Sequence, residues 1–170
     1  MMKKFFKYLK SSALLNDFAE ALDWLFDDQK FSEERNWNRG YVSKYTKKIK
    51  AQEHLSNAEN RVYYGKCIAK DFEKNDDRLP YITMKSGDSF ARDLIRHIRN
   101  GIAHGNANII IRNGIPYVKI NDYPDKTQSQ NKQTAKMFLP LSYITEFYKL
   151  YEEINKSIRH TSQKDRKATK

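Results

Sequence analysis

The sequence has few of the residues that cross-link or break a chain. One cysteine, Cys67, in 170 residues excludes an internal disulfide and fits a reducing compartment, so we expect a cytoplasmic protein. Six glycines and four prolines are too few for a low-complexity chain. No apolar run approaches the roughly 18 residues that a membrane-spanning helix needs, so we expect no membrane association.

What the chain has in excess is positive charge. The formal net charge is +11, and segments 30–50 and 156–170 each contribute +5 of it. Hydrophobic residues make up 39% of the sequence, enough for the core of one domain. A basic globular protein of this size favours an anionic partner, most commonly a nucleic acid, with a merely solvated basic surface as the alternative.

Hydrophobic periodicity predicts several helices. We expect them over 13–28, over 41–54, from a capping box at Ser56–Glu59 to Phe72, from Asp88 or Ser89 onward, and from Pro140 to about His160. Cys67 in the third of these is expected to be a small core residue rather than a nucleophile.

One β-hairpin is expected directly after the fourth helix. Two β-branched runs, 108–112 and 115–120, are joined by Asn113-Gly114, and Pro116 suggests an edge position and no large sheet. Segments 74–88 and 121–136 are interpreted as a linker and a loop. The expected fold is therefore mainly α, a bundle of about five helices with one small hairpin, forming a single domain over 1–160 with a basic disordered tail over 161–170.

The fourth helix carries the most informative string, 96–105, RHIRNGIAHG. Its apolar residues fall on one side, and on the other side Arg92, Arg96 and Arg99 recur at intervals of four and three. Arginine binds phosphate in bidentate fashion, and histidine exchanges protons near neutral pH. Arg99-Asn100-x3-His104 therefore suggests phosphate chemistry.

The same spacing occurs seven residues upstream, as Arg92-Asp93-x3-His97. Either match is a candidate, and we favour Arg99/His104 because Gly105 follows directly and glycine commonly ends a helix. His97 would lie in mid-helix. The simpler interpretations are that His104 complements the helix dipole and that Arg99 is an ordinary solvated arginine.

Arg99, Asn100 and His104 resemble the Arg-polar-x3-His signature of the HEPN (higher eukaryote and prokaryote nucleotide-binding) superfamily. The resemblance implies a metal-independent endoribonuclease without cofactor, in which these three residues are catalytic. It also implies a homodimer, RNA as substrate, and a toxin or antiviral role with a neutralising antitoxin or defence partner. Arg92, Arg96 and His97 are expected to bind RNA beside the catalytic residues.

In the expected mechanism, His104 activates the RNA 2′-hydroxyl or protonates the leaving 5′-oxygen, while Arg99 stabilises the charge on phosphorus. Asn100 would orient His104. Five residues along a regular helix separate Arg99 and His104 by about 140°, so either the helix end is distorted or a second subunit supplies one group. The competing hypotheses are a non-catalytic helical module that binds nucleic acid or a protein, and an antitoxin-like or scaffold subunit.

Overall fold

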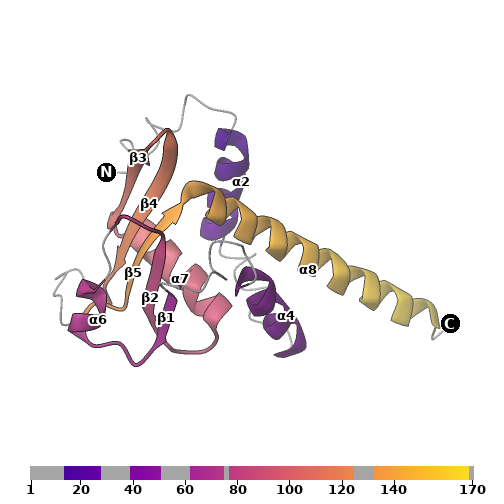
Figure 1. Ribbon diagram of the computed structural model, residues 1–170. Helices are drawn as coiled ribbons and strands as arrows, with labels where there is room; N and C mark the ends of the chain where they lie inside the picture. Colours follow the sequence, from indigo (N-terminus) through magenta and orange to yellow (C-terminus); the bar gives the residue numbers. More distant parts are fainter. Residues whose placement is uncertain (1–13, 28–38, 51–61, 75–76, 125–131, 169–170) are drawn as a thin grey trace.

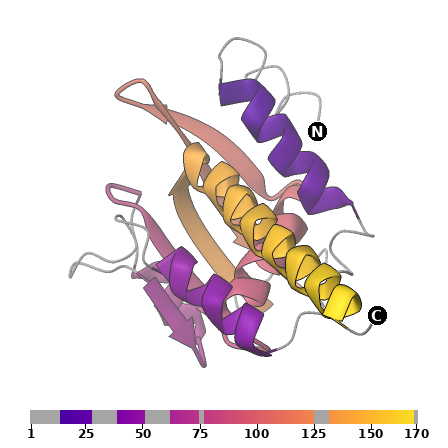
Figure 2. The same cartoon turned by 90° about the vertical axis from the view of Figure 1, so that its right-hand side faces the viewer.

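The computed structural model describes residues 14–27, 39–50, 62–74, 77–124 and 132–168, with side chains described within 20–160. A five-stranded mixed sheet runs in the order β1-β2-β5-β4-β3, and long helices cover one of its faces (Figures 1 and 2). The strands are β1 (Val62–Gly65), β2 (Tyr81–Lys85), β3 (Ala107–Arg112), β4 (Ile115–Asp122) and β5 (Ala135–Pro140). The helices described are α2 (Leu14–Phe26), α4 (Arg39–Lys50), α6 (Ala69–Glu73), α7 (Phe90–Ala103) and α8 (Leu141–Ala168).

The prediction of a mainly helical bundle is therefore wrong, because the protein has an α/β fold. The predicted hairpin exists as β3 and β4, and its turn has the two positive φ angles of a type I′ turn, 49° at Asn113 and 76° at Gly114. This hairpin is one side of the sheet rather than an isolated element, since β4 also pairs antiparallel with β5.

Three strands lie where no strand was predicted. The apolar and small residues of 62–65 were interpreted as a helix stripe, yet they form β1, which pairs in parallel with β2. Strand β2 lies within the predicted linker, and its first four residues are buried. Strand β5 begins in the last two residues of the predicted 121–136 loop, and it pairs with β2 and β4. Each run is too short for periodicity to distinguish a buried strand from another element.

Pro116 explains the wrong inference about sheet size. Strand β4 is internal, but its pairing with β5 begins only at Tyr117, opposite Pro140. Pro116 pairs with Ile111 of β3 and lies before the region where β4 has neighbours on both sides. The proline therefore lies where a missing N–H interrupts no central ladder.

The predicted helices over 13–28 and 41–54 correspond to α2 and α4, where Tyr45 and Ile49 point inward as expected. Residues 51–61, with the predicted capping box, lie outside the described residues. Helix α8 begins directly after Pro140, and its backbone continues to Ala168, beyond His160, where we placed the start of a disordered tail. No helix in the described ranges is long and apolar enough to cross a membrane.

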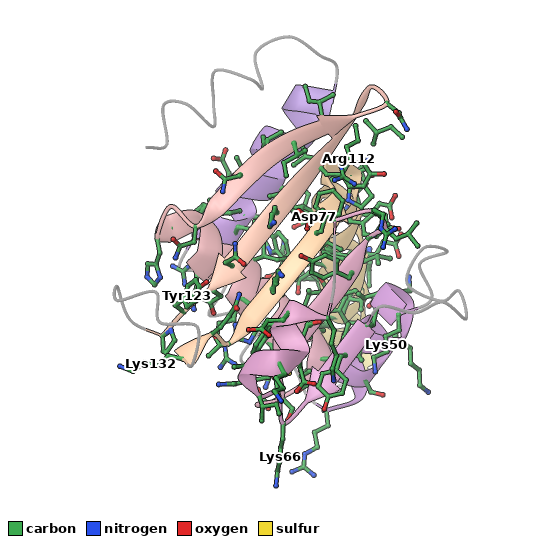
Figure 3. The ribbon with its side chains drawn as sticks, turned by 60° about the vertical axis from the view of Figure 1, so that its left-hand side comes forward. Lys50, Lys66, Asp77, Arg112, Tyr123 and Lys132 are labelled. Carbon is green, nitrogen blue, oxygen red and sulfur yellow. The ribbon has the colours of Figure 1, made fainter. Side chains whose placement is uncertain are left out.

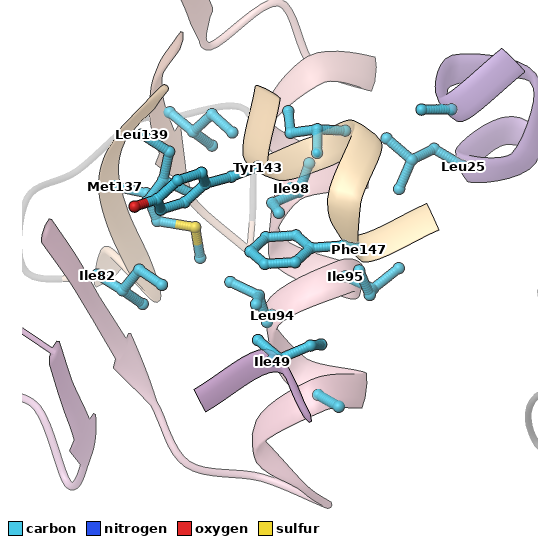
Figure 4. Close-up of a cluster of buried hydrophobic side chains, with 14 of the residues drawn as sticks. Leu25, Ile49, Ile82, Leu94, Ile95, Ile98, Met137, Leu139, Tyr143 and Phe147 are labelled. Carbon is cyan, nitrogen blue, oxygen red and sulfur yellow. The ribbon is translucent and has the colours of Figure 1, made fainter. Parts of the chain in front are cut away.

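The core lies between the sheet and helices α2, α4, α7 and α8. Figure 4 shows Ile82 and Met137 from the sheet packed with Leu94 and Ile98 of α7 and with Phe147 of α8. These five side chains are fully buried. Helix α7 therefore lies directly on the sheet, and its position is fixed by the core along its whole length.

Candidate active site

Helix α7 begins and ends with well-defined caps. At its start the Ser89 hydroxyl accepts a hydrogen bond from the Arg92 amide. At its end the Asn106 amide donates to the Gly101 carbonyl at 2.8 Å, and the Gly105 amide donates to the Ile102 carbonyl at 3.1 Å. Gly105 has a φ of 72°, so the end is a Schellman motif, which needs a left-handed residue at this position. The predicted stop at Gly105 is confirmed.

The proposed catalytic residues lie in the last turn before this stop. Arg99 and Asn100 are half-buried and His104 is exposed. The helix is regular through Ala103, and His104 has the nearly helical angles φ −83° and ψ 1°. The chain departs from the helix only at Gly105, so no distortion within α7 brings Arg99 and His104 together.

Arg92 and Arg96, expected to contact RNA, lie on the outer side of α7. Arg92 pairs with Asp88 at 2.6 Å, and Arg96 pairs with Asp93 at 2.6 Å. The side chain of Arg96 remains 48% exposed, whereas that of Arg92 is 23% exposed. Both guanidinium groups therefore have carboxylate partners in this chain.

His97 lies elsewhere, in the interior. It is 4% exposed, and its Nδ1 atom is 2.6 Å from Oδ2 of Asp122, which is 2% exposed. The Thr134 hydroxyl donates to the same carboxylate oxygen at 2.9 Å. His97 Nε2 and Asp122 Oδ1 are buried without a hydrogen-bond partner among the described residues. His97 therefore joins α7 to the end of β4 and is not on the surface that we assigned to RNA contact.

Asp93, the polar residue of the upstream match, is also part of the interior. It is 1% exposed and accepts hydrogen bonds from the Tyr64 hydroxyl and the Gly87 amide, both at 2.7 Å. Burial and this bond to Asp93 raise the pKa of Tyr64 to about 12. The start of α7 is thereby attached to β1 and to the loop after β2.

Gly101 brings α7 into close contact with β4. A Cβ atom at this position would lie 2.3 Å from Cγ2 of Ile120, closer than any real side chain tolerates. Gly101 lies one turn after His97, so the two residues fix the same face of the helix to neighbouring residues of β4. This contact holds the last turn of α7, where Arg99 and His104 lie.

Asp122 is the residue of this region that sequence reasoning missed. It was assigned to a polar loop because it follows the β-branched run of β4 and precedes Tyr123-Pro124. Nothing local marks it as a partner of His97, 25 residues away. The only sign in the sequence was that the Asp122 carboxylate follows closely after the predicted strand 115–120. Within the described ranges, no group of three or more metal-ligating side chains lies together.

A comparison with protein families supports the resemblance to the HEPN superfamily. A family model described as HEPN pEK499 p136 matches residues 28–162, which is most of the chain. No curated protein and no solved structure matches this chain. The match includes the whole sheet, helix α7 and most of α8. The chain is therefore a member of the HEPN superfamily, in the family described as HEPN pEK499 p136.

Proposed function

We propose that this protein is a metal-independent endoribonuclease whose catalytic residues are Arg99, Asn100 and His104. HEPN domains suggest nucleotide binding and are often ribonucleases. The observation that carries the proposal is the exposure of His104 at the end of α7, in the same helix end as the half-buried Arg99. The upstream match lacks this property, because its histidine is buried against Asp122.

In the proposed reaction the 2′-hydroxyl of RNA attacks the adjacent phosphorus. His104 takes the proton from that hydroxyl or gives one to the leaving 5′-oxygen, and Arg99 stabilises the added negative charge on phosphorus. The products carry a 2′,3′-cyclic phosphate and a 5′-hydroxyl. Asn100 orients His104 in this proposal, since four residues place the two side chains on adjacent turns.

The proposal includes a homodimer. Arg99 and His104 are separated by about 140° around a helix that stays regular between them, and by roughly 7.5 Å along its axis. A two-fold interface would supply the second copy of each residue to one site. We expect sedimentation at micromolar concentration to report about twice the 20.2 kDa mass of the chain. An active monomer would contradict a site shared between subunits.

A toxin or antiviral role with a neutralising partner is part of the same proposal and rests on the family resemblance. Expression of the wild-type protein in a bacterial host is expected to arrest growth. The His104→Ala variant is expected to leave growth unchanged. Equal arrest by both proteins would contradict a toxic role based on this site.

The decisive experiment incubates the purified protein with mixed RNA, with and without EDTA. We expect cleavage in both conditions and cyclic phosphate at the product ends. Arg99→Ala and His104→Ala should each lower the rate by roughly a hundredfold or more, the usual contribution of such groups. DNA, and a single deoxynucleotide at the cut position, should resist cleavage.

Two exposed residues of α8 provide matched controls. Arg159→Ala and His160→Ala remove the same side-chain types from an exposed helix surface and should leave the rate unchanged. Normal cleavage by both α7 variants, or a strict requirement for magnesium, would refute the proposal. Tight RNA binding without any cleavage would instead favour the non-catalytic binding module.

A further inference from the structure

The sheet has a second face, away from α7 and α8, that the proposed active site does not use. Side chains alternate along a strand, so neighbours of the core residues Val118 and Ile120 point to this face. Its central part, which we call the outer platform, consists of the exposed Asn108 and the half-buried Tyr117, Lys119, Asn121 and Lys136. Figure 3 looks onto this side of the sheet, with α6 in front of only one part of it.

The platform carries an aromatic side chain that is already stacked. Tyr117 lies parallel to Phe138, with the ring centroids 4.7 Å apart and an angle of 7° between the planes. Arg112 lies 5.1 Å from the centroid of the Phe138 ring. Phe138 is buried, whereas Tyr117 is half-buried, so Tyr117 presents the accessible ring of this stack. An unpaired base stacks on such a ring whatever its identity.

The platform also holds cations close together. Lys119 Nζ is 2.7 Å from Asp77 Oδ2, and Lys136 Nζ donates to the Phe72 carbonyl at 2.8 Å. Burial, and then the charge of Lys119, lower the pKa of Lys136, so the two ammonium groups repel one another. Arg112 also donates to the Asp77 backbone carbonyl (Figure 3). Asp77 and Glu73 raise the same pKa, so a phosphate group placed here would compete with these carboxylates for the two ammonium groups.

The position of the platform connects it to the proposed active site. The Asn121 amide donates to the Asn106 carbonyl at 3.0 Å, and Asn106 is two residues after His104. The end of β4, the start of β3 and the end of α7 therefore meet at one end of the sheet. Figure 3 shows Tyr123 and Lys132 at this same end. Four residues of extended chain separate Lys119 from Tyr123, which is a distance of roughly 14 Å.

We propose that the outer platform binds single-stranded RNA, with one base stacked on Tyr117 and phosphates beside Lys119 and Lys136, and directs the strand toward His104. The occupant is a single strand because bases in a duplex are not free to stack on a side chain. The inference rests on the proposed function for the identity of the substrate. Its test measures binding alone, so the two proposals can fail separately.

The probe is a short fluorescein-labelled oligouridylate with 2′-O-methyl groups, which the proposed mechanism cannot cleave. Its affinity for the full-length protein is measured by fluorescence anisotropy over a series of salt concentrations. Lys119→Gln and Lys136→Gln keep a hydrogen-bond donor for their protein partners but lose the charge. Each should weaken binding severalfold and make the salt dependence shallower by about 0.7 in log–log slope, the effect of one lost phosphate contact.

Lys48→Gln is the matched control. Lys48 is also ion-paired, with Glu153, and its side chain is 37% exposed against 30% for Lys119, but it lies on α4. This variant should bind the probe as the wild type does. Tyr117→Leu still covers Phe138 and should weaken binding about fivefold or more, with an unchanged salt slope, because it removes stacking only.

Unchanged affinity in the three platform variants, an equal loss in Lys48→Gln, or no binding of the probe would overturn the inference. Unchanged affinity would leave a protein partner as the occupant of this face. Circular dichroism and urea unfolding of each variant check that the fold persists. Platform-dependent binding by a wild-type protein that cuts no RNA would support the platform while refuting the proposed activity.

Discussion

Helix α7 carries the same residue pattern twice, and the two copies have opposite environments. Arg92-Asp93-x3-His97 and Arg99-Asn100-x3-His104 are seven residues apart, which places them on nearly the same face, with a drift of about 20°. In the first copy the polar residue and the histidine are buried and bonded. In the second the histidine is exposed at the helix end. The same spacing therefore gives a buried, bonded histidine in the first copy and an exposed histidine in the second.

The cause of this difference is the position of the sheet. Strand β4 supplies Asp122 as the partner of His97 and Ile120 as the neighbour of Gly101, whereas His104 is the C-cap residue, after the last helical residue of α7, and is exposed. The two histidines therefore differ in burial and not in their spacing from an arginine. The comparison predicts that changes in the first copy act on stability, while changes at Arg99 and His104 act on activity.

The largest effect on stability is expected from Asp122→Ala. It removes the carboxylate that bonds to the buried His97 and to the Thr134 hydroxyl, which should lower the free energy of unfolding by about 2 to 3 kcal/mol. Urea denaturation measures this change. His104→Ala, in contrast, should unfold at the same urea concentration as the wild type. If Asp122→Ala and the wild type have the same free energy of unfolding, the buried pair contributes nothing to stability. That result would contradict the proposed difference between the two copies.

A smaller effect is expected from Tyr64→Phe, which removes one hydrogen bond to the buried Asp93 carboxylate. The free energy of unfolding should fall by about 1.5 kcal/mol, since the bond is to a charged group. The pKa of Tyr64 is raised to about 12, so its contribution is complete below its ordinary pKa near 10 and is lost as the pH rises through 12. The difference between Tyr64→Phe and the wild type should therefore shrink above pH 10. A constant difference across that range would contradict the assigned bond.

Gly101→Ala tests the contact between α7 and β4. Alanine is favoured over glycine in a helix by about 1 kcal/mol, but overpacking against Ile120 costs about 1 to 3 kcal/mol. We expect a net loss of stability of about 1 kcal/mol, measured by thermal or urea unfolding. Adding Ile120→Ala removes the methyl group that collides, so the double variant should lose less than the sum of the two single losses. Strict additivity would show that the two residues do not press on one another.

The smallest effect is expected from Asp88→Ala, the matched control for Asp122→Ala. Its carboxylate pairs with Arg92 on the helix surface, and its side chain is 59% exposed. Surface pairs at this helical spacing contribute about 0.3 to 0.5 kcal/mol, so the urea midpoint should barely move. A loss as large as that of Asp122→Ala would show that burial does not separate the two pairs.

Local features of the sequence were predicted well. The apolar face of α7, the stop at Gly105, the Asn113-Gly114 turn and the helices α2 and α4 all follow from neighbouring residues, because caps, turns and helical periodicity act over a few positions. Cys67 is buried, as expected of a small core residue, and burial raises the pKa of its thiol.

Pairing between distant segments was not predictable in this way. Strands β1, β2 and β5 are four to six residues long, and each becomes a strand only through neighbours far along the chain. The burial of His97 likewise depends on Asp122, which belongs to another element. The sequence alone determined helices α2, α4, α7 and α8, the hairpin turn and two Arg-polar-x3-His candidates. The tertiary structure decided which histidine is exposed, because His97 lies where α7 packs against β4 and bonds to Asp122, whereas His104 lies at the C-cap, after the last helical residue.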